Sequence, residues 1–140
     1  MTETHEQYSL QCTPLTGNDN LYGSGGGEAL YYFVFPNFML NILPGRLQTN
    51  LILPLAHNKS RDVFDYYYDD ISSERAVKMI GEDLAYSDRI QQEDMEICRH
   101  VQRGLESVAY DRGRFSVEME MGVYHFQCLL KKAYRSIQQR

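Results

Sequence analysis

A change in hydrophobic period near residue 70 constrains the fold more than any other feature of this sequence. Before it lie the runs EALYYFVF, NFMLNILP and RLQTNLILPL, and a fourth run, SRDVFDYYYDD, follows the polar loop AHNKS. Runs rich in aromatic and branched aliphatic residues are typical of β-strands, and Pro44-Gly45 is placed as a turn between the second and third runs. We therefore predict four adjacent antiparallel strands.

The third of these runs also predicts which face of the sheet is covered. Two sets of residues alternate along it: Leu47, Thr49, Leu51 and Leu53 on one side, and Gln48, Asn50 and Ile52 on the other. An antiparallel sheet commonly has one face packed on the core and one in water. We expect the leucine side to be the covered one.

After Asp70 the pattern changes to helix formers, which continue from Ile71 to about Leu105. We expect a break around residues 81–87, and Asp70 or Ser72 could cap the start. The alternating segment RFSVEMEM predicts a short extended piece before the last helix, VYHFQCLLKKAYRSI. The apolar face predicted for that helix consists of Val123, Phe126, Leu130, Ala133, Tyr134 and Ile137. Strands followed by helices indicate an α+β fold, an antiparallel sheet packed on C-terminal helices.

The segment from Met1 to Glu28 is polar and turn-rich, and it ends in a glycine-rich stretch with Gly23, Gly25, Gly26 and Gly27. A phosphate-binding loop should lead into a helix and usually carries a lysine, whereas this stretch leads into a predicted strand. We therefore interpret it as a surface loop or hairpin connection.

Composition excludes several classes of function. The net charge is −5, and the longest basic cluster is Lys131-Lys132, so the chain lacks the positive stripe that binds nucleic acid. No signal sequence or segment of membrane-spanning length is present, which argues against a membrane protein. Three widely spaced cysteines, Cys12, Cys98 and Cys128, suit reduced thiols in a cytoplasmic protein better than a disulfide framework.

One acidic residue falls on the apolar stripe of the first helix. At helical spacing Asp94 joins Ile90, Ile97, Cys98, Val101 and Leu105. An unpaired carboxylate in apolar surroundings is costly, so an inward Asp94 should have a cation, a hydrogen-bond network or a raised pKa. The alternative is an exposed position at the edge of the stripe or near a helix N-terminus, where acids are favoured.

Other residues give no pattern of catalysis or metal binding. The four histidines, His5, His57, His100 and His125, include no pair at the spacing of a helical metal motif, and each is expected to be surface or structural. No nucleophile elbow is present, and nothing pairs a cysteine with a base.

The segments YYFVFPNFMLNILPGRLQTNLILPL and QQEDMEICRHVQRGLESVAYDRGRFSVEMEMGVYHFQCLL resemble the catalytic domain of Rieske non-haem iron oxygenases. The resemblance covers residues 5–135 and is to the large (alpha) subunits of ring-hydroxylating dioxygenases, closest to the choline, carnitine and glycine-betaine monooxygenase branch. It implies a helix-grip fold and hydroxylation of an aromatic or quaternary-ammonium substrate with O2. It also implies electrons from a reductase or ferredoxin, and a homo-oligomer, a trimer, in the intact enzyme.

The resemblance also implies a role for Asp94. The family holds mononuclear Fe(II) with two histidines and one aspartate, and the aspartate lies in a Glu-Asp pair that here is Glu93-Asp94. Asp94 is therefore the expected metal ligand. The sequence departs from the family elsewhere, because it has no D-x-x-H-x-x-x-x-H segment and no C-x-H and C-x-x-H pairs for a [2Fe-2S] cluster.

These departures predict that residues 1–140 are the C-terminal portion of a ring-hydroxylating catalytic domain, separated from the Rieske domain and the two-histidine segment. A truncated or split reading frame would produce such a chain, which alone should be inactive. The alternative is a non-catalytic helix-grip module that binds an apolar ligand, with Asp94 incidental.

Overall fold

The computed structural model describes residues 1–15 and 27–138 and divides the chain into two compact units. Unit 1 comprises Met1–Tyr68 and Phe115–Arg140, and unit 2 comprises Asp69–Arg114. Each is described by itself. The glycine-rich loop predicted near residue 25 lies outside the described residues, except for Gly27, which begins a strand.

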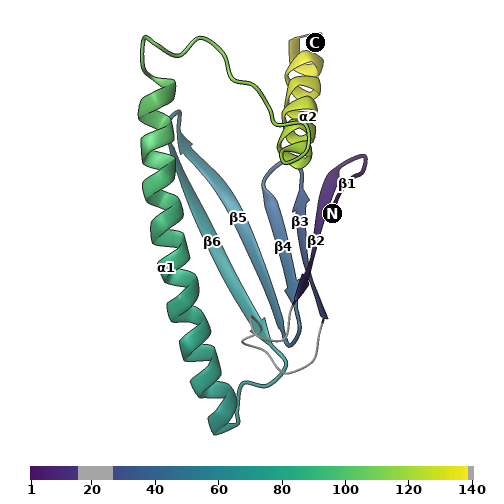
Figure 1. Ribbon diagram of the computed structural model, residues 1–140, viewed down its shortest axis with the longest axis vertical. Helices are drawn as coiled ribbons and strands as arrows, with labels where there is room; N and C mark the ends of the chain where they lie inside the picture. Colours follow the sequence, from purple (N-terminus) through teal and green to yellow (C-terminus); the bar gives the residue numbers. More distant parts are fainter. Residues whose placement is uncertain (16–26, 139–140) are drawn as a thin grey trace. The chain divides into compact units, whose positions relative to one another are not determined.

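Unit 1 is built on a six-stranded antiparallel sheet whose strands are neighbours in sequence order (Figure 1). The strands are β1 (Thr2–Thr4), β2 (Tyr8–Leu15), β3 (Gly27–Val34), β4 (Phe38–Leu43), β5 (Arg46–Ala56) and β6 (Lys59–Tyr68). The last four confirm the predicted strands, and Gly45 has a φ of 73° in the predicted turn, a conformation that glycine adopts without strain.

The first two strands contradict the prediction of a turn-rich N-terminal segment. β2 pairs with β3 along its whole length, from Tyr8 opposite Val34 to Leu15 opposite Gly27, and β1 pairs with β2. Because β2 contains polar residues such as Ser9 and Gln11, its sequence does not show the apolar pattern typical of a strand. Its strand conformation depends on a long-range partner, which a local pattern does not report.

The strand register sorts the side chains onto two faces, because residues directly opposite one another in a sheet point to the same side. One face, here called the Gln48 face, carries Ser9, Gln11, Thr13, Ala29, Tyr31, Phe33, Met39, Asn41, Gln48, Asn50, Ile52, Phe64 and Tyr66. The other, the Leu51 face, carries Leu10, Leu30, Tyr32, Val34, Phe38, Leu40, Ile42, Leu47, Leu51, Leu53, Val63 and Tyr67.

Burial along β5 is the reverse of the prediction. Gln48 and Asn50 are 5% and 6% exposed, whereas Leu51 is 37% exposed. The buried amides are satisfied locally, because an Arg46 guanidinium N–H donates to the Gln48 side-chain oxygen and the Gln48 amide donates to Asn50 Oδ1 at 2.8 Å. Arg46 also lies over the Tyr66 ring, with its Cζ 5.5 Å from the ring centroid. Hydrogen bonding removes most of the cost of burying these groups, so apolar character alone does not decide which face is covered.

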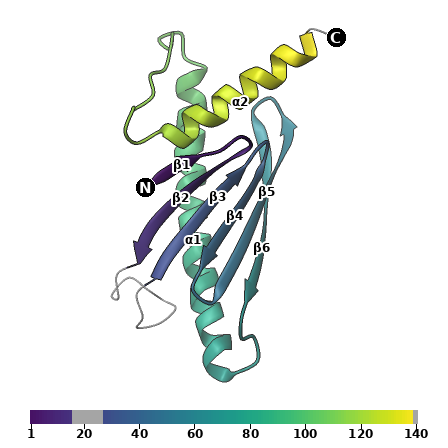
Figure 2. The same ribbon diagram turned by 90° about the vertical axis from the view of Figure 1, so that its right-hand side faces the viewer.

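The last helix of unit 1, α2 (Met121–Gln138), lies at one end of the sheet beside β1 and β2 (Figure 2). Phe126, Leu130 and Ala133 on its predicted apolar face are half-buried. Val123, Tyr134 and Ile137 are 50%, 62% and 68% exposed, so this part of the prediction was wrong.

A turn, rather than an extended piece, leads into α2. Residues 117–119 form this turn, which contradicts the prediction for RFSVEMEM. The Ser116 backbone amide donates to the Glu120 carboxylate at 2.6 Å, and the Met119 amide donates to the Ser116 hydroxyl at 3.3 Å. These local hydrogen bonds compete with strand pairing and fix the start of the helix.

Unit 2 contains one continuous helix, α1 (Glu74–Leu105), without the break predicted at residues 81–87. Gly81 is accommodated inside the helix, where it weakens helix propensity without preventing the backbone hydrogen bonds. Ser73, rather than Asp70 or Ser72, is the N-cap, and its hydroxyl accepts from the Ala76 amide at 3.1 Å. Hydrogen bonds from the Ser73 hydroxyl and from the Ser72 and Ser73 amides lower the pKa of Asp70 to about 2. Neither described helix is both long and apolar enough to cross a membrane.

Candidate functional site

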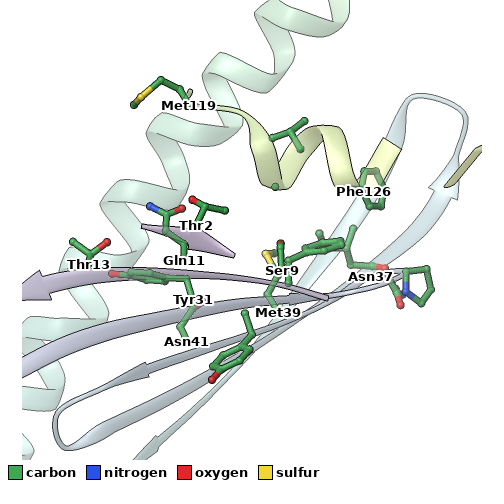
Figure 3. Close-up of a pocket in the computed structure, with 16 residues that line it drawn as sticks. Thr2, Ser9, Gln11, Thr13, Tyr31, Asn37, Met39, Asn41, Met119 and Phe126 are labelled. Carbon is green, nitrogen blue, oxygen red and sulfur yellow. Dashed lines mark hydrogen bonds between the residues drawn. The ribbon is translucent and has the colours of Figure 1, made fainter. Parts of the chain in front are cut away.

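A cavity of about 860 Å³ lies in unit 1 between the Gln48 face and the start of α2 (Figure 3). Sixteen residues line it, from β1 to β5, the β3–β4 turn and residues 119–126. In Figure 3 Thr2 and Gln11 rise from their strands toward the segment that carries Met119 and Phe126. The volume is that of a small-molecule site.

One side of the cavity is apolar and aromatic. Phe126 reaches from α2 to the sheet, where its ring meets Phe33 edge-on, with centroids 5.2 Å apart and planes at 84°. A second contact, at 5.9 Å, is with Phe35. Met39 and Ile52 continue this wall on β4 and β5. Edge-to-face aromatic pairs stabilise such a contact beyond the area they bury, so the helix is fixed to the sheet at the cavity.

The turn between β3 and β4 is fixed to β5 by a reciprocal pair of hydrogen bonds. The Asn37 side-chain amide donates to the Ile52 carbonyl at 2.7 Å, and the Ile52 amide donates to the Asn37 carbonyl at 3.0 Å. Asn37 is thus held by the backbone and shapes the cavity wall.

Three other polar side chains form a row across the cavity. Gln11 is directly opposite Tyr31, and Tyr31 is directly opposite Asn41, so the three lie side by side on β2, β3 and β4. Within the described part of the chain none of these three side chains has a hydrogen-bond partner. Each can both donate and accept a hydrogen bond. The row therefore presents uncommitted, neutral hydrogen-bonding groups to a ligand.

The lining carries no formal charge. None of the sixteen residues is an aspartate, glutamate, lysine, arginine or histidine. Arg46 and Asp62 lie elsewhere on the same side of the sheet, and burial raises the pKa of Asp62, partly offset by a hydrogen bond from the Val63 amide. The cavity can bind and orient a small molecule, but its lining includes no carboxylate, imidazole, amine or guanidinium group to serve as a general acid or base.

Asp94, the predicted metal ligand, lies on α1 in unit 2 and is exposed. Of the two positions left open for Asp94, the structure has the exposed one, and Ile97, Val101 and Leu105 of the same stripe are 59%, 54% and 48% exposed. Asp94 makes no hydrogen bond or ion pair with the described residues, so its oxygens are available. Its neighbours Glu93 and Glu96 are exposed, as expected.

A second aspartate on α1 was missed by the sequence argument. Asp83 is 2% exposed and has an interaction partner. It precedes Asp94 by about three helical turns and lies on the same side of the helix. Extending the Asp94 stripe toward the N-terminus would have found it.

No described histidine belongs to a metal-ligand group with Asp94. His5 stacks on Tyr8 at 4.3 Å and lies 3.6 Å from Glu3, while His57 and His100 are exposed. The Nε2 atom of His125 is buried and has no hydrogen-bond partner among the described residues. No group of three His, Cys, Asp or Glu side chains able to hold a metal occurs in residues 1–15 and 27–138. The three cysteines are free.

Comparison with known proteins places this geometry in context. The family described as ring hydroxylating alpha subunit (catalytic domain) matches residues 5–136. A chloroplastic choline monooxygenase of Arabidopsis thaliana is 49% identical over 106 residues, which are 75% of this chain and 24% of the relative. The corresponding protein of Amaranthus tricolor is 37% identical over 130 residues, 92% of this chain and 29% of the relative. The chain thus spans about a quarter of the length of these curated relatives.

Solved structures share the fold. The quaternary ammonium Rieske monooxygenase CntA, in complex with an inhibitor, matches with a TM-score of 0.79 and 22% identity, over 94% of this chain and 38% of that one. The same enzyme in complex with L-carnitine matches with a TM-score of 0.70 and 21% identity, over 94% of this chain and 36% of that one. The antiparallel sheet with C-terminal helices is therefore the fold of a Rieske oxygenase catalytic domain.

Proposed function

The chain belongs to the family of ring-hydroxylating alpha-subunit catalytic domains, and from this premise we propose that it is the C-terminal part of an oxygenase that hydroxylates a quaternary-ammonium substrate with O2. The observation that carries the proposal is the aromatic cavity without charged lining residues, which lies on one face of the antiparallel sheet that this family shares. The choline monooxygenase relatives and the carnitine-bound structure support the substrate class by their names.

The cavity suits the proposed substrate by its chemistry. A quaternary ammonium group has no N–H to donate, so it gains little from a hydrogen-bond acceptor. It is held instead by the faces of aromatic rings. Phe33, Phe126 and Tyr31 provide such rings around the cavity.

Asp94 would supply one of three iron ligands. Its carboxylate is exposed and makes no hydrogen bond or ion pair in the described chain, so both of its oxygens are available to coordinate a metal ion. The described residues do not supply the other two ligands, so the fit is to a shared site rather than to a site complete in this chain. When bound, Fe(II) in a 2-His-1-carboxylate arrangement supplies the activation of O2. This chain would contribute the carboxylate and the substrate cavity.

The remaining components are proposed from the family. A [2Fe-2S] cluster and the two histidines would come from a Rieske domain and a two-histidine segment outside these residues, with electrons from a reductase or ferredoxin. One solved relative is described with inter-subunit electron transfer, which supports an oligomer, and we propose a trimer.

A cytoplasmic location remains a prediction, and the curated relatives carry the word chloroplastic in their names. Nothing in the comparisons supports the alternative of a non-catalytic module.

Co-expression tests this proposal. The chain is produced with a second chain that carries the Rieske domain and two-histidine segment of a choline monooxygenase relative. The two should co-purify, bind iron, and consume O2 in the presence of choline and reductant. The 140-residue chain alone should retain negligible iron after dialysis, because one carboxylate does not replace three ligands.

Matched variants assign the ligand. Asp94→Ala should abolish iron binding in the co-purified complex, whereas Glu93→Ala, a neighbouring exposed carboxylate, should leave it unchanged. Iron retained in Asp94→Ala would reject Asp94 as a ligand. Stoichiometric iron in the isolated chain, or two halves that never co-purify, would reject the shared-site proposal.

A further inference from the structure

One residue that lines the cavity has no side chain. Gly122, the second residue of α2, lies over Ser9 of β2. A Cβ atom at Gly122 would be 3.5 Å from the Ser9 hydroxyl oxygen and 3.8 Å from the Thr2 methyl carbon. Ser9 is 8% exposed, so the helix comes close to the sheet at this place. The space between the Gly122 backbone and Ser9 is here called the Gly122 gap.

Neither backbone conformation nor crowding explains a glycine at position 122. Gly122 does not have the positive φ that favours glycine, in contrast to Gly45 with its φ of 73°. A Cβ atom 3.5–3.9 Å from its neighbours is in ordinary van der Waals contact, so alanine would fit without displacing the sheet. Alanine is also the better helix former. The fold therefore permits alanine here, and what glycine adds is space in the cavity.

The Gly122 gap lies between two ends of the cavity. Phe126 and Phe33, which is directly opposite Ser9, form the aromatic end. The other end is polar and includes Gln11, two residues further along β2. In Figure 3 Ser9 lies between Phe126 on one side and Gln11 on the other. A ligand that extends along β2 from the aromatic end to the polar end therefore passes through the Gly122 gap.

The size of the side chain at position 122 decides whether such a ligand fits. A methyl group there would already contact Ser9 and Thr2, so it would fill the gap. Inserting further carbon atoms into a filled space forces the neighbouring groups to shift, which is costly. A ligand that stays at the aromatic end does not use this space.

We propose that Gly122 is a specificity-determining residue, because its lack of a side chain lets the cavity accept a ligand whose substituent extends past Ser9 from the aromatic end. The inference rests on the proposed function only for the group held at the aromatic end, a quaternary ammonium. It assigns the accepted length of the substituent to one position of α2. Neither the family description nor the names of the relatives make this assignment.

Calorimetric titration of the full chain and of Gly122→Ala with a short and a long probe tests this inference. Tetramethylammonium is the short probe and needs only the aromatic end, whereas the straight chain of hexyltrimethylammonium extends beyond it. Gly122→Ala should weaken the long probe at least about tenfold and the short probe less than about twofold, because the added methyl occupies the space of the chain. Equal losses for the two probes would overturn the proposal, and so would a long probe that does not bind the unchanged chain.

Melting temperatures separate the cavity from the stability of the helix. Gly122→Ala should raise the melting temperature, since alanine favours the helix and restricts the unfolded chain. Gly81→Ala is the matched control, because a Cβ atom at Gly81 in α1 meets nothing within 4 Å. It should also raise the melting temperature and leave the binding of both probes unchanged. A melting temperature that falls in Gly122→Ala would show that Gly122 is required by the fold and would overturn the proposal.

A second substitution places the effect in the Gly122 gap. Ser9→Ala removes the hydroxyl oxygen, the atom nearest to the new methyl. Added to Gly122→Ala, it should restore the affinity for the long probe about threefold, since the two positions share one space. If Ser9→Ala restores nothing, the methyl acts outside the gap and the assignment is wrong.

A neutral pair of probes separates this inference from the proposed function. tert-Butanol and 2-methyl-2-octanol have an uncharged carbon in place of the quaternary nitrogen, and they differ from each other by the same methyl-to-hexyl change. If they bind as well as the cations and Gly122→Ala weakens only the longer one, the quaternary-ammonium class fails while the role of Gly122 stands. If the cations are preferred but Gly122→Ala treats short and long probes alike, the role of Gly122 fails while the class stands. None of these titrations requires iron, so they are independent of the co-expression test.

Discussion

The two faces of the sheet contrast in a way that reverses the usual rule for burial. The Gln48 face carries amides and hydroxyls, yet it contains every buried residue of the described strands: Ser9, Ala29, Gln48 and Asn50. The Leu51 face is lined with leucine, valine and aromatic residues, yet Leu51, Val63 and Tyr67 are 37%, 37% and 56% exposed.

The difference shows that hydrogen-bonded polar side chains can be the more buried ones on a sheet, while leucine and aromatic side chains stay partly exposed. Exposed apolar surface on a sheet usually marks an interface. The exposed Leu51, Val63 and Tyr67 give the Leu51 face this character.

The largest effect should come from exchanging polarity on the two faces. Gln48→Leu removes a hydrogen-bond partner of both Arg46 and Asn50 in a buried position and should lower the free energy of unfolding by about 2 kcal/mol. Leu51→Gln, on the neighbouring part of the other face, should change it by less than about 0.5 kcal/mol. Urea denaturation of both variants makes the measurement. If Leu51→Gln lowers the free energy of unfolding more than Gln48→Leu does, the Leu51 face is the more buried one and the contrast between the two faces is wrong.

A slightly smaller effect is expected where α2 meets the Gln48 face. Phe126→Ala removes the contacts with Phe33 and Phe35 and should cost about 1.5 kcal/mol, below the full cost for a buried ring because Phe126 is only half-buried. Tyr134→Ala on the same helix is the control, since Tyr134 is 62% exposed. Equal melting temperatures for the two variants would show that α2 is not anchored at the cavity.

The pH dependence of α1 helicity provides a control that depends on neither face of the sheet. Hydrogen bonds to Asp70 lower its pKa from 3.8 to about 2. A group with a depressed folded pKa stabilises the folded state above its unfolded pKa, and that contribution disappears as the pH falls through the folded value. The helicity of α1 should therefore fall between about pH 4 and pH 2.

Circular dichroism against pH makes this measurement, with Asp70→Asn expected to remove the transition. Asp88→Asn, an exposed acid within α1, should retain it. A transition that persists in Asp70→Asn would show that the acid sensitivity of α1 does not come from Asp70.

The smallest effect is predicted at Asp94. An exposed carboxylate without a partner contributes little to stability, so Asp94→Leu should change the free energy of unfolding by less than about 0.5 kcal/mol. Asp83→Leu, a buried and partnered carboxylate on the same side of the helix, should cost about 1–3 kcal/mol. Marked stabilisation by Asp94→Leu in a urea melt would show that Asp94 is buried in solution, the inward position that the sequence pattern left open.

Local pattern was enough to predict the four strands β3 to β6, the turn at Pro44-Gly45 and the helix α2. These elements follow from residues a few positions apart, whose period, branching and turn chemistry act within the segment itself. The family resemblance rested on equally local stretches, and the comparisons confirmed it. The role of Asp94 as an iron ligand was likewise taken from one short motif, and it stays a prediction.

Three features could be seen only in the tertiary structure. They are the burial of Gln48 and Asn50 on β5, the addition of β1 and β2 to the sheet, and the continuation of α1 through Gly81. The tertiary structure alone brought Gln11, Tyr31 and Asn41 into one row, although they are far apart in the sequence. The physical reason is that burial and strand pairing depend on partners distant in the chain and on whether polar groups find hydrogen bonds. A residue's own polarity reports neither, which is why buried Gln48 and exposed Leu51 were predicted in reverse.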